Sequence, residues 1–141
     1  MTTRARLGRC LVLALLVGSC EQGPGRAPGP PSRALFADLL GNEPAAEGRA
    51  TIRDLDGRAI VYVELPKGSG SEWSVRIREG DCTNPGAVIE MLGVAEGGTI
   101  RTSVASPAGR LGTAIVTVSP IGEPGPVLSC GVLDWEPQPS G

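Results

Sequence analysis

Apolar and polar residues alternate along several short stretches of this chain, the pattern of strands that pack one face against a core. The clearest stretch is 72–79, whose predicted inner residues are Trp73, Val75 and Ile77, and whose outer residues are Ser74, Arg76 and Arg78. Segment 48–55 alternates in the same way, with Ala50 and Ile52 on one face. Asp56-Gly57 then gives a strong hairpin signal before a β-branched strand at 58–65.

Further strands are predicted at 99–104, 114–118 and 127–133, and clusters of Gly and Pro separate them. Segment 33–40 fits a helical turn or a first strand, and its spacing does not decide between them. With 21 Gly, 13 Pro and only 3% aromatic residues, the chain favours many short strands around an aliphatic core. We therefore predict one all-β domain, a Greek-key β-sandwich or barrel, at 33–135.

The N-terminus has the pattern of a secretory signal peptide at 1–19. Arg4, Arg6 and Arg9 precede an apolar run at 10–17, which is shorter than the roughly 20 residues of a membrane span. The sequence Val-Gly-Ser-Cys at 17–20 resembles the lipobox of bacterial lipoproteins. That resemblance implies cleavage before Cys20 and acylation of its thiol; the alternative is an ordinary signal peptide that leaves Cys20 as a free thiol.

Segment 20–32 is rich in Pro and Gly and is predicted to be a tether between the lipid anchor and the domain. Segment 136–141 is predicted to be a disordered tail. Glu21 follows the proposed anchor, whereas lipoproteins kept in the inner membrane usually have Asp there. The expected location is the cell envelope, on the outer membrane facing the periplasm or the cell surface.

Charge and composition exclude several functional classes. Without the three arginines of the signal peptide, 10 basic and 15 acidic residues remain, a charge of −5, and no basic segment suggests a nucleic-acid partner. The chain contains no histidine, which rules out imidazole as a metal ligand, a general base or a partner for a nucleophile.

The segment Glu79-Gly80-Asp81-Cys82, followed by Asn84-Pro85-Gly86 and later by Cys130-Gly131, resembles the Cu/Zn superoxide dismutase family and its short secreted relatives. The resemblance spans 35–133. It implies the family's Greek-key fold and its disulfide between Cys82 and Cys130. Closing this loop would stabilise the fold by roughly 4 kcal/mol in a chain-entropy model; the alternative is two unpaired buried thiols.

The same resemblance places the family's metal-binding histidines at positions that cannot bind copper or zinc. They fall at Arg76, Arg78, Val88 and near Val118, and the arginine that guides superoxide falls near Val127. Guanidinium groups stay protonated and Val has no donor atom. We therefore expect no metal, no cofactor, no catalytic residue and no dismutase activity.

Two interpretations of Arg76 and Arg78 remain open. A strand places both on one face about 6.5 to 7 Å apart, so they could form an anion-binding patch. Alternatively, they line a solvated face and pair with Glu64, Glu72 or Glu79.

The leading hypothesis is a non-catalytic envelope lipoprotein that acts as a binding or structural module. The alternative is residual redox or metal handling, with a hard cation held by carboxylates. The nearest candidate ligands are Asp54, Asp56, Glu79 and Asp81. A third hypothesis is an unidentified envelope protein partner that binds an exposed strand edge or the face near Trp135.

Overall fold

The computed structural model describes residues 33–66, 72–95, 98–122 and 125–137, which form a nearly closed antiparallel β-barrel. The predicted signal peptide 1–19, the tether 20–32 and residues 138–141 lie outside the described residues. The elements in chain order are β1 (Ala34–Gly41), the 3-10 turn η1 (Pro44–Ala46), β2 (Gly48–Leu55), β3 (Arg58–Glu64), β4 (Trp73–Gly80), β5 (Pro85–Ala95), β6 (Thr99–Val104), α1 (Ala108–Leu111), β7 (Ile115–Pro120), β8 (Ser129–Val132) and β9 (Asp134–Trp135).

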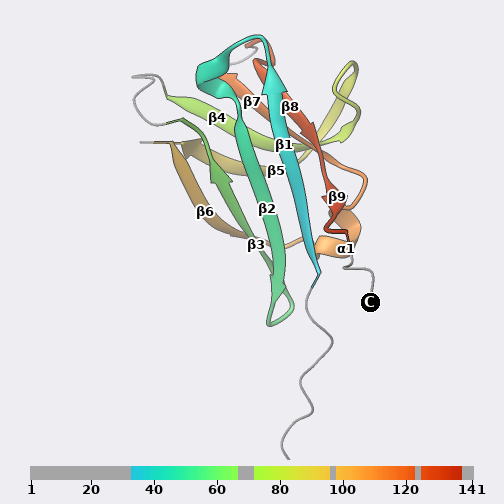
Figure 1. Cartoon of the computed structure of the whole chain (residues 1–141). Helices are drawn as coiled ribbons and strands as arrows, with labels where there is room; N and C mark the ends of the chain where they lie inside the picture. The colour runs from blue at the N-terminus through green and yellow to red at the C-terminus, as the bar shows by residue number, and fades with distance from the viewer. Residues whose placement is uncertain (1–32, 67–71, 96–97, 123–124, 138–141) are drawn as a thin grey trace, which may run out of the picture.

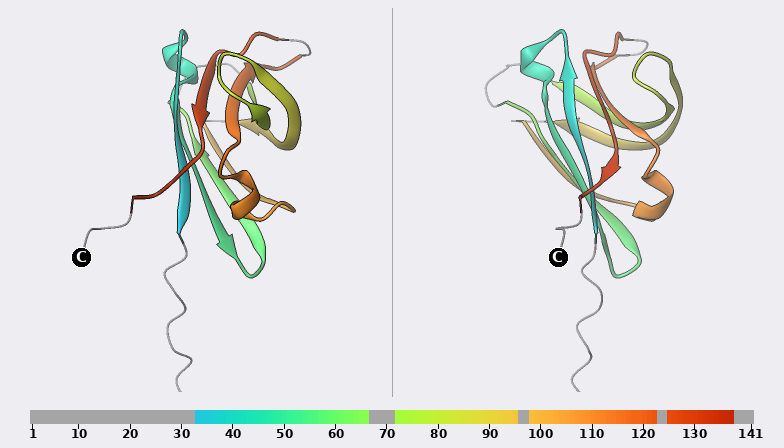
Figure 2. Two further views of the ribbon diagram at one scale, coloured as in Figure 1. Left: turned by 90° about the vertical axis from the view of Figure 1, so that its right-hand side faces the viewer. Right: turned by 45° about the vertical axis from the view of Figure 1, so that its right-hand side comes forward.

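The strands follow one another around the barrel in the order β5-β4-β7-β8-β1-β2-β3-β6, and β9 pairs with β1. Strand β1 belongs to both halves of the barrel: 34–39 pairs with β2, whereas Leu40 and Gly41 pair with β8. Figures 1 and 2 show β1, β2 and β3 forming one layer, with β4, β5 and β7 crossing behind it. The barrel stays open between β5 and β6, the two ends of this order.

The predicted hairpin at Asp56-Gly57 is confirmed, and it sets the register of β2 against β3. Both turn residues have positive φ, 51° for Asp56 and 80° for Gly57, as a two-residue hairpin turn requires. The ladder runs without a slip from Leu55 opposite Arg58 to Arg49 opposite Glu64. Segment 33–40 was compatible with a helical turn or a strand, and it forms the strand β1.

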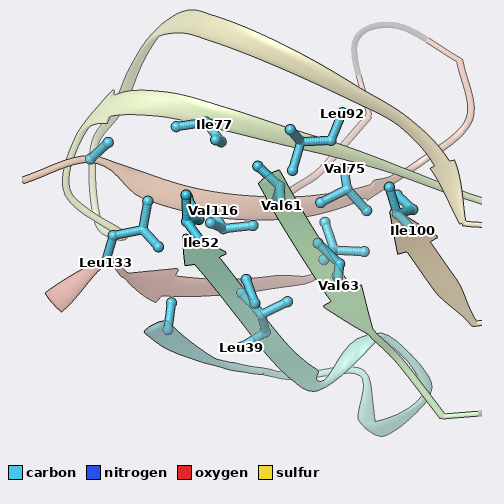
Figure 3. Close-up of a cluster of buried hydrophobic side chains, with 14 of the residues drawn as sticks. Leu39, Ile52, Val61, Val63, Val75, Ile77, Leu92, Ile100, Val116 and Leu133 are labelled. Atoms are coloured by element: carbon cyan, nitrogen blue, oxygen red, sulfur yellow. The ribbon is translucent and has the colours of Figure 1, made fainter. Parts of the chain in front are cut away.

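The interior is filled by the apolar phase of each strand, as the alternation predicted. Figure 3 shows side chains of β2 and β3 pointing toward those of β4 and β7. Trp73, Val75 and Ile77 are buried, and so are Ala50 and Ile52. The largest fully buried side chains are Leu35, Leu39, Ile52, Ile77, Leu111, Ile115, Leu133, Val61, Val63, Val75, Val116 and Val118. Apart from Trp73, the core is thus aliphatic, in keeping with the low aromatic content.

Strand β5 was not predicted, because its residues do not alternate between apolar and polar. The pairing of β4 with β5 explains this irregularity. Its register shifts between Val75 and Arg76, and again between Ile77 and Arg78. At such bulges two residues oppose one, so the period of two is broken. The short elements η1, α1 and β9 were not predicted either.

Several strands differ by one or two residues from their predicted bounds, and the C-terminal segment begins in contact with the barrel. β7 extends to Pro120, and β8 begins at Ser129 rather than at 127. The backbone N–H of Glu136, which the prediction placed in the tail, donates to the carbonyl oxygen of Ala34 at 2.9 Å. In the described part of the chain, no helix is long and apolar enough to cross a membrane.

Two isoleucines test the assignment of the core. Ile77 is 0% exposed, whereas Ile121 is 49% exposed. We expect Ile77→Ala to lower the free energy of unfolding by about 2–5 kcal/mol, and Ile121→Ala to change it by less than about 0.5 kcal/mol. Urea denaturation of both variants measures the difference. Equal losses would show that the interior is not the one described.

Candidate functional site

Arg76 and Arg78 lie on the outer face of β4, as the alternation predicted. They stand opposite Thr117 and Ile115 of β7. This face is not solvated as one interpretation required, because Arg76 is only 9% exposed. The Nε of Arg76 donates to the sulfur of Met91 at 3.4 Å, and the Nε of Arg78 donates to the carbonyl oxygen of Gly86 at 2.9 Å.

These contacts give both arginines a packing role. The long aliphatic stem of Arg76 covers sheet surface, as such stems commonly do. Thr117, directly opposite, is buried, and its hydroxyl donates to the carbonyl oxygen of Arg76 at 3.5 Å. The contact of Arg78 with Gly86 fastens β4 to the start of β5 rather than to one of the three glutamates considered above. An anion-binding role for the pair stays a prediction.

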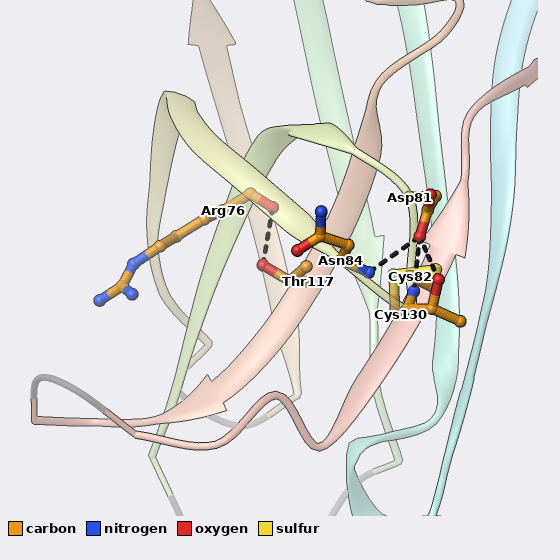
Figure 4. Close-up of a disulfide and its surroundings, with 7 residues drawn as sticks. Arg76, Asp81, Cys82, Asn84, Thr117 and Cys130 are labelled. Carbon is orange, nitrogen blue, oxygen red and sulfur yellow. Dashed lines mark hydrogen bonds between the residues drawn. A yellow bond between two sulfur atoms is a disulfide. The ribbon is translucent and has the colours of Figure 1, made fainter.

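A disulfide joins Cys82 and Cys130, as the resemblance implied, with their Cα atoms 5.7 Å apart. Cys82 lies in the loop between β4 and β5, and Cys130 lies in β8. The bond therefore reaches past β7, which separates β4 from β8 in the sheet. Figure 4 shows the loop beside β8 and the guanidinium of Arg76 extending away from the disulfide.

Asp81 organises the loop that carries Cys82. Its Oδ1 accepts hydrogen bonds from the backbone N–H groups of Thr83 and Asn84, each at 2.8 Å, and from the hydroxyl of Thr83 (Figure 4). These bonds stabilise the charged carboxylate, so the pKa of Asp81 lies below its ordinary value; the Thr83 hydroxyl has the largest effect. The loop is thus held by local bonds as well as by the disulfide.

Three of the four carboxylates proposed as cation ligands, Asp54, Asp56 and Asp81, take part in local structure. Asp54 accepts a hydrogen bond from the backbone N–H of Ala108 at 2.9 Å, and Asp56 forms the hairpin turn. Glu79 lies near the end of β4, and Asp81 lies in the loop that carries Cys82. Within the described residues, no group of three or more acidic or thiol side chains could hold a metal ion.

The outer face of β4 and β7 therefore offers two guanidinium groups and the hydroxyl of Thr117. A guanidinium stays protonated and cannot act as a base near neutral pH. No family model, curated protein or solved structure matches this chain. Its own side chains define what its surfaces can bind.

A second cationic surface, which the sequence did not reveal, lies on the outer face of β2, β3 and β6. We call it the arginine face; it consists of Arg53, Arg58, Ile60, Tyr62 and Arg101. The guanidinium carbon of Arg101 lies 5.3 Å from the centroid of the Tyr62 ring. All of these residues fall in the outer phase of predicted strands. However, nothing in the sequence indicated that β6 pairs with β3 and brings Arg101 opposite Tyr62.

The two surfaces suggested for a protein partner are both present. Along β5, which pairs with β4 alone, Val88, Met91 and Val94 are exposed. Trp135 is half-buried against the core, and the guanidinium carbon of Arg33 lies 5.1 Å from its ring centroid. A partner at either surface stays a prediction.

The pKa of Asp81 can be tested by removing its strongest partner. We expect Thr83→Ala to raise this pKa toward its ordinary range, because the hydroxyl donor is lost, and Thr99→Ala on β6 to leave it unchanged. A carboxyl ¹³C NMR titration measures both.

The same shift fixes the sign of the pH dependence. Because the pKa is lowered by folding, the stabilisation from Asp81 is complete above the unfolded pKa of about 3.9, and it is lost as the pH falls through the folded pKa. If Thr83→Ala left the Asp81 pKa unchanged, the hydroxyl would not be its main partner.

Proposed function

We propose that this protein is a non-catalytic lipoprotein of the bacterial cell envelope, in which a superoxide dismutase-like Greek-key barrel serves as a binding or structural module. Acylation at Cys20 anchors it, and segment 20–32 tethers the barrel to the membrane. The outer membrane, on the side of the periplasm or the cell surface, is its proposed location.

The strand order supports the Greek-key assignment. Strands β4, β5 and β6 follow one another in the chain, and β7 returns to lie beside β4 rather than beside β6. A fourth strand that returns to lie beside the first of three consecutive strands is typical of a Greek key. Here the second and third of these strands, β5 and β6, border the open side of the barrel and are not hydrogen-bonded to each other within the described residues. The confirmed disulfide between the loop after β4 and β8 also supports the likeness to the superoxide dismutases.

The observation that carries the non-catalytic assignment is the chemistry of the positions that correspond to metal ligands. On β4 these are Arg76 and Arg78, whose Nε atoms donate to groups of the protein itself. Val88 stands opposite Arg78 on β5. None of these side chains can donate an electron pair to copper or zinc.

The register bears on the position near Val118. Val118 pairs with Val75 and points into the core. Thr117 shares the outer face with Arg76. Its hydroxyl is a poor ligand for copper or zinc compared with imidazole or thiolate. The proposal is therefore the same for Val118 and for Thr117.

The alternative, metal handling through unconventional ligands, receives no support from the described carboxylates. Asp54 and Asp56 belong to the β2–β3 hairpin, whereas Glu79 and Asp81 flank the cysteine loop. Asp81 already accepts three hydrogen bonds from Thr83 and Asn84.

Lipid anchoring predicts the behaviour of the protein in a cell. With a Gram-negative host, we expect the full chain to fractionate with membranes and to incorporate labelled palmitate. Cys20→Ser should be unlabelled and leave the membrane fraction, whereas Cys10→Ser, which alters only the signal peptide, should behave like the unmodified chain. Labelling of the Cys20→Ser protein would refute the anchor.

Metal analysis tests the assignment as a non-enzyme. The full chain, purified in detergent, is incubated with copper and zinc, passed through gel filtration, and assayed for bound metal and for superoxide dismutation. A Cu/Zn superoxide dismutase stripped of metal and treated in parallel is the positive control. We expect no stoichiometric metal and no activity; one tightly held equivalent would contradict the ligand argument.

A further inference from the structure

The arginine face brings three cations around one apolar side chain. Ile60 lies in the middle of the face, with Arg53 opposite it on β2 and Arg101 on the far side on β6. From the usual strand spacing and rise, the Cα atoms of Arg53 and Arg101 lie about 12 Å apart, and those of Arg53 and Arg58 about 8 Å apart. Long side chains at these separations can converge on one ligand.

The charges at the two ends of this sheet face differ. At one end, Asp38, Arg49 and Glu64 lie side by side, and Arg49 forms an ion pair with Asp38 at 2.9 Å. Toward the hairpin, neither Arg53 nor Arg101 has an ion pair with any carboxylate of the described residues, and the same holds for Arg58. With Arg53, Arg58 and Arg101 against Asp54 and Asp56, the hairpin end therefore keeps a net positive charge.

A shallow hollow of about 230 Å³ lies within this cationic end. Its walls are Arg53, Asp54, Leu55, Ile60, Tyr62 and Arg101. Asp54 contributes the one negative charge, and its Oδ1 already accepts the N–H of Ala108. Tyr62 is 40% exposed beside Arg101, so the hollow combines apolar and aromatic surface with two guanidinium groups.

The shape of the surface favours a polymer of rings over a peptide. Peptides bind mainly at sheet edges, in grooves or through backbone nests, whereas one class of small barrel, the OB-fold, binds oligonucleotides and oligosaccharides on the face of its second and third strands. The proposed location outside the cytoplasm favours a sugar polymer over a nucleic acid.

We propose that the arginine face binds an acidic polysaccharide, a chain of sugar rings that carry carboxylate groups. Arg53 and Arg101 would hold carboxylates through paired N–H donors, while Ile60 and Tyr62 would pack against the ring faces. The proposal rests on the proposed function in that it names the ligand of an extracytoplasmic binding module, but it needs neither the anchor nor the absence of metal.

Binding can be measured with the full chain in detergent and fluorescent polygalacturonate as the probe, at about 0.15 M salt. We expect the double variant Arg53→Ala, Arg101→Ala to bind about tenfold more weakly or worse, because two charge-assisted contacts are lost. The variant Arg33→Ala, Arg110→Ala removes the same charge elsewhere and should bind normally. Neutral dextran should not bind.

Two further samples make the test specific. Arg53→Lys, Arg101→Lys keeps the charge but loses the forked donors, so it should bind more weakly than the unmodified chain with an unchanged melting temperature. Single-stranded oligothymidylate tests phosphate polymers. Absence of polygalacturonate binding, equal loss in both alanine double variants, or tighter binding of oligothymidylate would each overturn the proposal. None of these outcomes depends on acylation of Cys20 or on metal, so the proposed function is tested separately.

Discussion

The barrel depends on the transfer of β1 from one layer to the other. Its first six residues extend the β2–β3 layer, and its last two pair with β8. Where β1 and β8 meet, the backbones approach so closely that side chains would collide: a Cβ at Gly41 would overlap the carbonyl oxygen of Leu128, and one at Gly131 would overlap that of Asp38. Glycine at both positions allows the two layers to enclose one core.

The two layers then present different outer faces. On β4 and β7, the outward residues Ser74, Arg76, Thr117 and Ser119 are all buried. The nearby loop is fastened to β8 by the disulfide and held internally by Asp81. On β2, β3 and β6, the outward arginines remain exposed. The open layer is the one whose arginines are accessible to a ligand, because they are not packed against the protein.

The sequence predicted those parts of the fold that depend on period and local turn chemistry. Val75 and Ile77 alternate with polar neighbours and are buried, and Asp56-Gly57 forms its hairpin. The resemblance supplied the disulfide. Neither the pattern nor the resemblance predicted how distant strands pair. The register of β7 against β4 turns Val118 inward, and the bulges between β4 and β5 break the alternation of β5. Both depend on the barrel as a whole.

The candidate site was harder to predict for the same reason. Arg76 and Arg78 are close in sequence, so the alternation predicted that they share one face of a strand. Their burial depends on neighbours from β5 and β7, which the alternation does not show. Tyr62 and Arg101 are 39 positions apart in the sequence, and they become neighbours because β6 pairs with β3. Residues that form a surface through non-local pairing leave no local pattern to recognise.

The position of Tyr62 also argues that the arginine face has a role beyond stability. The chain has two Trp, one Tyr and one Phe, and apart from Trp73 its core is built from aliphatic side chains. Packing between Tyr62 and Arg101 across the strands contributes roughly 0.2–1 kcal/mol, and a β-branched residue would suit an exposed strand about as well. Stability alone therefore gives little reason to place the single tyrosine on the surface, beside an arginine that has no carboxylate partner among the described residues. A ligand that carries both negative charge and a ring face would use both features together.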